Sequence, residues 1–156
     1  MTSSTLPSTT AAAAVNSLRT RSSGEVLGAD DPHYERARQV WNGAVDRHPA
    51  VIVGCRDTSD VIAAVQIAAE HGLPLTVRGG GHDWAGRALN DGGVVIDLSA
   101  MRAVTVEVSG GTAAAQGGAT SGDLVAAARS SELAPVTGTV KAVGMAGLTL
   151  AGGTAR

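Results

Sequence analysis

The sequence has very few aromatic residues: its 156 residues include no Phe, one Tyr and two Trp. Proteins that bind single-stranded nucleic acid depend on aromatic side chains for base stacking and on basic residues for phosphate contacts. With 12 Lys and Arg against 14 Asp and Glu, the net charge is −2, and no basic run occurs. Nucleic acid is therefore excluded as an expected partner, and the core is predicted to consist of Val, Leu, Ile and Ala.

Cysteine is nearly absent as well. Cys55 is the only one, which excludes an internal disulfide, and its place after the apolar run Val51–Gly54 predicts a buried thiol. The four histidines show no ligand spacing, so no metal site is expected. His48 precedes a proline and His71 ends a predicted helix, where positive charge suits the helix dipole, so both are interpreted as structural.

Long hydrophobic runs are also missing. No stretch approaches the roughly 20 apolar residues that a membrane span needs. The apolar patch Ala11–Val15 is too short for the core of a secretory signal, and no basic residue precedes it. A cytoplasmic location without a membrane partner is therefore expected. Residues 1–24, rich in Ser, Thr and Ala without an apolar period, are predicted to form a disordered tail.

Glycine is abundant, with 21 residues. Glycine is needed where the backbone takes unusual dihedral angles or where another group closely approaches the main chain. The abundance therefore indicates a chain that wraps a ligand, although a glycine-rich composition can also arise by chance.

The periodicity of apolar residues predicts an α+β fold and not a regular doubly wound sheet. Residues 30–48 are predicted to be helical in part, with Tyr34, Ala37, Val40 and Trp41 at helical spacing. Further helices are predicted from Thr58 or Ser59 to Gly72, from Ser121 to about Ser130, and as a turn near Gly144–Leu148. Strands are predicted at Val51–Gly54, Pro74–Val77, Val94–Leu98, Val104–Val108 and Thr112–Gln116.

The first candidate site is the loop that follows the second of these strands. It reads Arg78, Gly79, Gly80, Gly81 and His82. Bare amide N–H groups on such a loop can surround a diphosphate, because no side chain blocks the approach and each N–H carries partial positive charge. The loop lacks the spacing of a Rossmann fingerprint and the lysine of a P-loop, so a flexible turn is the alternative. Arg78 could add charge to the site or form a surface salt bridge.

The second candidate site is the glycine-rich segment 138–153. Its glycines include Gly144, Gly147, Gly152 and Gly153, a spacing typical of a chain that passes beside a flat ligand. A glycine-rich hinge is the alternative. The chain ends three residues later without a closing strand or helix, so it is expected to be incomplete at its C-terminus.

Four stretches resemble the FAD-linked oxidases of the vanillyl-alcohol-oxidase type, in the berberine-bridge-enzyme-like branch. In chain order they are Arg36–Asn42, Ala50–Val53 with Asp60–Val65, Leu75–His82, and Gly117–Thr120 with Gly144–Leu150. Together the four stretches cover the chain from about residue 25 to its end. Their occurrence in this order indicates the family more specifically than any one stretch does.

The resemblance implies a PCMH-type FAD-binding domain of two α+β subdomains with the cofactor between them. It implies that His82 matches the histidine that family members attach to the 8α-methyl carbon of the flavin, and that Arg78 and the three glycines hold the diphosphate. Further cofactor-binding candidates are Gly138, Thr139, Gly144, Gly147 and Leu148. Some branch members carry a second link from a cysteine, but the matching residue is Val140, so a single covalent bond is expected.

The leading hypothesis is that residues 25–156 are the N-terminal part of the FAD-binding domain of an oxidoreductase. Such an enzyme would accept hydride from an alcohol, sugar or amine-like carbon of a small substrate. The substrate domain and the tyrosine-type bases of the family have no counterpart here, so no catalytic residue is expected and the chain alone is expected to be inactive. Two alternatives stay open: a truncated, non-catalytic FAD-binding module, and a phosphate-binding domain without a redox role.

Overall fold

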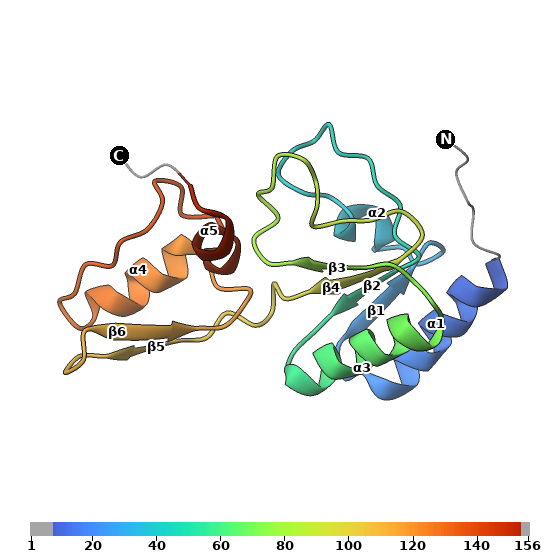
Figure 1. Cartoon of the computed structure of the whole chain (residues 1–156), viewed down its shortest axis with the longest axis horizontal. Helices are drawn as coiled ribbons and strands as arrows, with labels where there is room; N and C mark the ends of the chain where they lie inside the picture. The colour runs from blue at the N-terminus through green and yellow to red at the C-terminus, as the bar shows by residue number, and fades with distance from the viewer. Residues whose placement is uncertain (1–7, 154–156) are drawn as a thin grey trace.

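A computed structural model describes residues 8–153, which fold into two α+β parts that follow each other along the chain (Figure 1). The elements of the first part are α1 (Ser8–Arg21), β1 (Glu25–Gly28), α2 (Tyr34–Ala37), β2 (Val51–Gly54), α3 (Thr58–Glu70), β3 (Leu75–Arg78) and β4 (Val94–Asp97). Those of the second part are β5 (Val104–Glu107), β6 (Thr112–Ala115), α4 (Ser121–Arg129) and α5 (Met145–Ala151). The predicted α+β class is confirmed.

The first part is built on a four-stranded sheet of order β1-β2-β4-β3, in which β2, β4 and β3 are parallel and β1 is antiparallel. All five predicted strands form, with bounds that differ by at most one residue. The sequence alone does not predict β1, because Val26 and Leu27 are too short an apolar run to indicate a strand. Since successive strand residues point to opposite faces, the sheet separates two cores.

Helices α1 and α3 cover one face of this sheet (Figure 1). The core between them is aliphatic, as the composition predicts, and consists of Ala14, Val15, Leu18, Val26, Val51, Val53, Cys55, Ala64, Ile67, Ala68, Leu73, Val94 and Ile96. The Cys55 thiol is fully buried there, as predicted, and burial raises its pKa to about 12.

Helix α1 corrects the prediction of a disordered tail over residues 1–24. It spans 14 residues, and Ala14 and Leu18 are fully buried against the sheet. The sequence does not predict this helix because its buried hydrophobic residues are only Ala14, Val15 and Leu18, a short apolar stripe among Ser, Thr and exposed Ala. Residues 1–7 lie outside the described part of the chain.

The opposite face of the sheet is covered by α2 and the segments around it. The second core consists of Leu27, Tyr34, Ile52, Leu89 and Val95. Within the predicted helical region 30–48, α2 ends at Ala37, so the expected helical positions of Val40 and Trp41 are wrong. The side chain of Asn42 accepts the N–H of Ala44 at 3.1 Å, an Asx-turn that competes with helix formation.

The N-cap of helix α3 lies one residue before the position that the sequence predicts. The N-cap is Asp57 and not the predicted Thr58 or Ser59, because the Asp57 carboxylate accepts the N–H groups of Ser59 at 2.9 Å and Asp60 at 3.1 Å. At the other end Gly72 takes a left-handed φ of +62°, as expected of a helix stop.

Asp60 fastens α3 to the turn that follows α1. Its carboxylate is 1% exposed and accepts hydrogen bonds from the Ser22 hydroxyl at 3.0 Å, the Ser23 N–H at 2.7 Å and the Arg56 N–H at 2.9 Å. Burial alone would raise the pKa of Asp60, but these donors outweigh it and lower the pKa. Asp60 therefore ties the first turn of α3 to the turn after α1.

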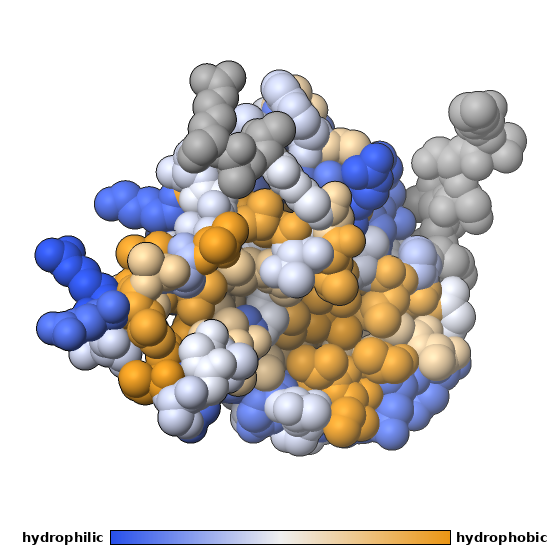
Figure 2. Space-filling view, turned by 60° about the vertical axis from the view of Figure 1, so that its left-hand side comes forward, coloured by the Kyte–Doolittle hydropathy of each residue, from blue (hydrophilic) through white to orange (hydrophobic). Residues whose placement is uncertain are grey.

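The second part is a β5–β6 ribbon with α4 against β5. Thr120 caps α4 through the N–H of Asp123, and the Asp123 carboxylate accepts the N–H of Thr120 at 2.8 Å, which completes a capping box. Every residue of β6 is exposed. Figure 2, which brings this part forward, shows wide hydrophobic surface, and the exposed large hydrophobic residues of the second part are Val108, Val125, Leu133, Val136, Val140 and Leu150.

Candidate functional site

The register of the first sheet places four residues in one row across its edge. Glu25 pairs with Gly54 on β2, Gly54 with Asp97 on β4, and Asp97 with Arg78 on β3. Because β2, β4 and β3 are parallel, the row lies at their carboxyl ends, where open α/β sheets bind ligands. A cavity of about 500 Å³ opens here and all four residues line it, a volume typical of small-molecule sites.

Arg78 is held inside the protein by the residues around it. Its Nη2 lies 2.6 Å from Oδ2 of Asp97, and the two side chains are only 12% and 11% exposed. Its Nη1 donates to the carbonyl oxygens of Ala37 and Gln39. Asp97 also accepts the N–H of Ser99 at 3.1 Å and its hydroxyl at 3.0 Å. The network fixes the end of β3, from which the glycine loop starts. Arg78 thus forms a salt bridge, as one of the two alternatives had it, but the pair is nearly buried and not at the surface.

The loop after Arg78 has backbone N–H groups without a backbone partner. Within residues 8–153, the N–H groups of Gly79, Gly80, Gly81 and His82 have no backbone acceptor. Gly81 takes a φ of +66°, and all three glycines line the cavity. Successive N–H groups around a left-handed residue make a concave, partially positive surface that suits phosphate oxygens. The donors present therefore fit a diphosphate group.

The glycine loop is also the place where the two parts of the molecule touch. A Cβ at Gly80 would lie 2.3 Å from the amide nitrogen of Gly144, and a Cβ at Gly144 would lie 2.5 Å from that of Gly80. A Cβ at Gly79 would lie 2.8 Å from the carbonyl oxygen of Gly117. Gly144 forms an isolated antiparallel bridge with Thr120. The three glycine-containing stretches of the family resemblance therefore meet at one junction, and side chains there would separate the backbones.

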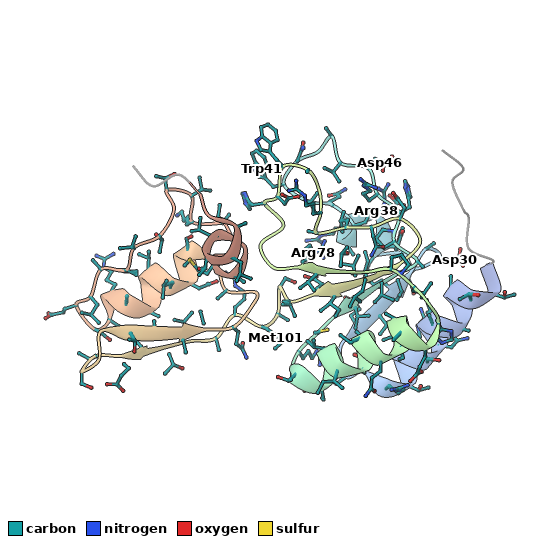
Figure 3. All side chains as sticks on the ribbon, in the orientation of Figure 1. Asp30, Arg38, Trp41, Asp46, Arg78 and Met101 are labelled. Atoms are coloured by element: carbon teal, nitrogen blue, oxygen red, sulfur yellow. The ribbon has the colours of Figure 1, made fainter. Side chains whose placement is uncertain are left out.

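His82 lies beside the cavity, with its imidazole stacked on Trp41. The two ring centroids are 5.4 Å apart and the ring planes differ by 20°. Trp41 lines the cavity, whereas His82 is half-buried and does not. Figure 3 shows Trp41 at the outer end of the loop region, with Arg78 closer to the sheet. Among the described residues, the His33 imidazole is hydrogen-bonded to Glu25 at 3.2 Å, the Nε2 of His48 lies 3.8 Å from Oδ1 of Asp46, and the His82 imidazole forms no hydrogen bond.

The later candidates fall around α5. Of these, Gly144 alone meets the glycine loop. Gly138 lies next to Leu148, whose Cδ2 would be 3.5 Å from a Cβ at Gly138, and Thr139 is exposed. Gly147 lies within α5, and a Cβ there would have no neighbour within 4 Å. None of the five lines the cavity.

Sequence reasoning does not find Glu25, Gly54 or Asp97 as site residues. Their meeting with Arg78 depends on the strand order, which the sequence does not specify. The sequence contains one indication of this site. Asp97 is a carboxylate inside the predicted apolar strand Val94–Leu98, and a buried charge needs a partner of opposite charge.

Over residues 8–153, no cluster of three or more His, Cys, Asp or Glu side chains is placed to hold a metal ion. In the same residues, no helix has both the length and the hydropathy required to cross a bilayer.

Unpaired loop amides at the carboxyl edge of parallel strands in an α+β domain are an arrangement typical of domains that bind phosphate-containing cofactors. Residues 49–156 match the family described as FAD binding domain, and the chain belongs to this family. The resemblance to FAD-linked oxidases and the PCMH-type fold are thereby confirmed.

Similar proteins include an oxidase and an FAD-linked oxidoreductase. (R)-6-hydroxynicotine oxidase of Paenarthrobacter nicotinovorans is 41% identical over 130 residues, which cover 83% of this chain and 28% of that protein. FAD-linked oxidoreductase hasG of Aspergillus fumigatus is 42% identical over 139 residues, covering 89% of this chain and 30% of that protein.

Solved structures agree with these relatives. The crystal structure of 6-hydroxy-D-nicotine oxidase from Arthrobacter nicotinovorans matches with a TM-score of 0.78 at 39% identity, over 81% of this chain and 28% of that one. Glucooligosaccharide oxidase from Acremonium strictum matches with a TM-score of 0.80 at 29% identity, over 88% of this chain and 29% of that one. The chain thus spans less than a third of the length of the proteins it matches.

Proposed function

We propose that this chain forms the FAD-binding part of a flavin-dependent oxidoreductase that takes hydride from a small organic substrate, at an alcohol, sugar or amine-like carbon. FAD, when bound, supplies the capacity to accept the hydride. The proposal rests above all on the loop of unpaired amides, because it offers a diphosphate its donors in a chain of the FAD-binding family. The proposed compartment is the cytoplasm, with neither nucleic acid nor a membrane as partner.

The residues of the junction have separate proposed roles. The N–H groups of Gly79, Gly80 and Gly81 hold the diphosphate, and Arg78 adds positive charge while its pair with Asp97 fixes the start of the loop. Cofactor contacts from the second part are proposed for Gly138, Thr139, Gly144, Gly147 and Leu148. Gly144 has the strongest support, because it already touches the loop.

His82 is the proposed site of covalent attachment of FAD. Its imidazole nitrogens have no protein partner among the described residues, so a lone pair is free to act as a nucleophile. The glucooligosaccharide oxidase of A. strictum carries a 6-S-cysteinyl, 8α-N1-histidyl FAD. In the present chain Val140 stands at the position matched to the family's cysteine, and Cys55 is buried in the α1–α3 core, so the bond to His82 is the single link proposed.

Acid precipitation of the chain after incubation with FAD tests this proposal. A yellow pellet is expected for the wild-type chain, and a colourless pellet for His82→Ala, because only a covalent bond survives unfolding. His48→Ala is the matched control, since His48 is an exposed histidine away from the cavity, and it should keep the yellow pellet.

Other outcomes identify the alternatives. A yellow supernatant over a colourless wild-type pellet would mean reversible binding and would remove the role of His82. Uptake of inorganic pyrophosphate without uptake of FAD would support the phosphate-binding alternative. Weak, reversible FAD uptake by the wild-type chain would favour the truncated, non-catalytic module.

A further inference from the structure

We infer that Trp41 is a positioning residue for His82. The indole of Trp41 holds the imidazole of His82 in the orientation that presents a ring nitrogen to FAD. The inference rests on the proposed function of His82 as the attachment point. Trp41 is 59% exposed, although large aromatic side chains usually gain more by burial. Its exposed place beside the cavity therefore calls for a cause other than core packing.

The stacked geometry suits a nucleophilic imidazole. With planes 20° apart and centroids 5.4 Å apart, the indole lies in an offset stack against the imidazole, a contact made through the ring face and not through a ring nitrogen. The lone pair of a neutral imidazole lies in the ring plane, so a partner on the face restricts the ring without blocking the reacting atom. A hydrogen bond to the same nitrogen would have blocked it.

His82 needs such a restraint because of the residues before it. It follows three consecutive glycines, the residue type with the widest backbone freedom, and Gly81 has a φ of +66°. The imidazole itself turns about two bonds and would otherwise occupy several rotamers. Covalent bond formation requires the reacting atoms to meet in a narrow range of distances and angles. Holding one rotamer therefore raises the fraction of chains ready to react.

The segment that carries Trp41 grips the loop on both sides of His82. The N–H of Trp41 donates to the carbonyl oxygen of Gly81 at 3.2 Å. The Nδ2 of Asn42 donates to the carbonyl oxygen of Trp84 at 2.9 Å. These two bonds fix the backbone before and after His82, and the indole fixes its side chain. The three contacts together make one clamp.

Trp84 provides the matched control. Its ring meets that of Trp41 edge-on, with centroids 5.6 Å apart and planes at 73°, and it is 74% exposed. It belongs to the same cluster, but among the described residues its ring does not stack on His82. A variant at Trp84 therefore removes an aromatic side chain from the cluster and leaves the imidazole restrained.

The experiment compares Trp41→Leu, Trp41→Phe and Trp84→Leu with the wild-type chain at saturating FAD. The measurement is the rate at which flavin becomes resistant to acid precipitation. Trp41→Leu should slow attachment roughly two- to tenfold, the range expected for loss of one aromatic stack, and Trp41→Phe should recover part of the rate. Trp84→Leu should leave it unchanged. Equal rates in the wild-type chain and Trp41→Leu would overturn the inference.

A second measurement needs no flavin. The imidazole proton resonances of His82, assigned by their loss in His82→Gln, should move in Trp41→Leu because the ring current of the indole is gone, and should stay in Trp84→Leu. Unmoved resonances in Trp41→Leu would show that the stack does not exist. A wild-type chain without covalent flavin would instead refute the attachment itself, which is a result distinct from either failure of the Trp41 inference.

Discussion

Arg78 and Asp97 face each other on neighbouring strands, and both are almost removed from solvent. Their pairing could not be predicted from the sequence, because it depends on β3 lying next to β4. The glycine triplet and His82 could be selected, since a strand that runs into bare amides is a local pattern. The spacing of Trp41 predicts a helical position, whereas its stacking on His82 depends on how two distant loops fold together.

Removal of one partner of a nearly buried ion pair leaves the other charge without compensation. Arg78→Met should therefore lower the free energy of unfolding by about 3–5 kcal/mol in urea titrations. Arg87→Met is the control, because its pair with Asp83 involves an arginine side chain that is 79% exposed, and it should cost no more than about 1 kcal/mol. Equal losses in both variants would contradict the structural role assigned to Arg78.

At the level of elements, the apolar period predicted the strands to within a residue but the helices less well. Strands β2 and β4 are recognisable because they are buried on both faces and read as continuous apolar runs. Helix α1 is not, because its apolar stripe is short, with Ala14, Val15 and Leu18 as its buried hydrophobic residues. Helix α2 ends at Ala37, short of the apolar spacing that reaches Trp41, and Asn42 starts a separate turn further along. Helix caps depend on side-chain hydrogen bonds, which explains why Asp57 was not distinguished from Thr58.

The start of α4 should make the stability of the chain sensitive to acid. A hydrogen bond from the Arg102 guanidinium, followed by bonds from Thr120, holds the pKa of Asp123 well below its ordinary value. Because the folded-state pKa is the lower one, the stabilising contribution is complete above about pH 4 and is lost as the pH falls further. In urea titrations, Asp123→Asn should be less stable at pH 7 and should lose less on acidification. Asp30→Asn, at an exposed position, should retain the wild-type pH profile.

For the molecule as a whole, the resemblance predicted two α+β subdomains, and the structure shows two such parts meeting at the glycine loop (Figure 1). The relative placement of the two parts was beyond the reach of local patterns. Gly80 and Gly144 are far apart in the sequence, and neither position alone shows that the other will lie against it.

Two glycine-to-alanine substitutions distinguish a glycine required by close backbone contact from a glycine in an open position of a helix. Gly80→Ala should lower the free energy of unfolding by about 1–3 kcal/mol, because the new methyl group has no room against the backbone of Gly144. It should also weaken FAD uptake. Gly147→Ala, in open space within α5, should stabilise the chain by about 0.5–1 kcal/mol. Thermal unfolding measures the stability of both variants. A Gly147→Ala variant less stable than the wild-type chain, together with a Gly80→Ala variant of wild-type stability, would contradict the close contact assigned to Gly80.

The contact between Gly80 and Gly144 has a consequence for how this region can change. When two side chains collide, a second mutation can relieve the collision by trimming the neighbour. Here the neighbour is already a glycine, so nothing smaller exists to replace it. No suppressor at Gly144 can rescue a larger residue at Gly80, or the reverse. Any rescue would have to come from a shift of a whole segment.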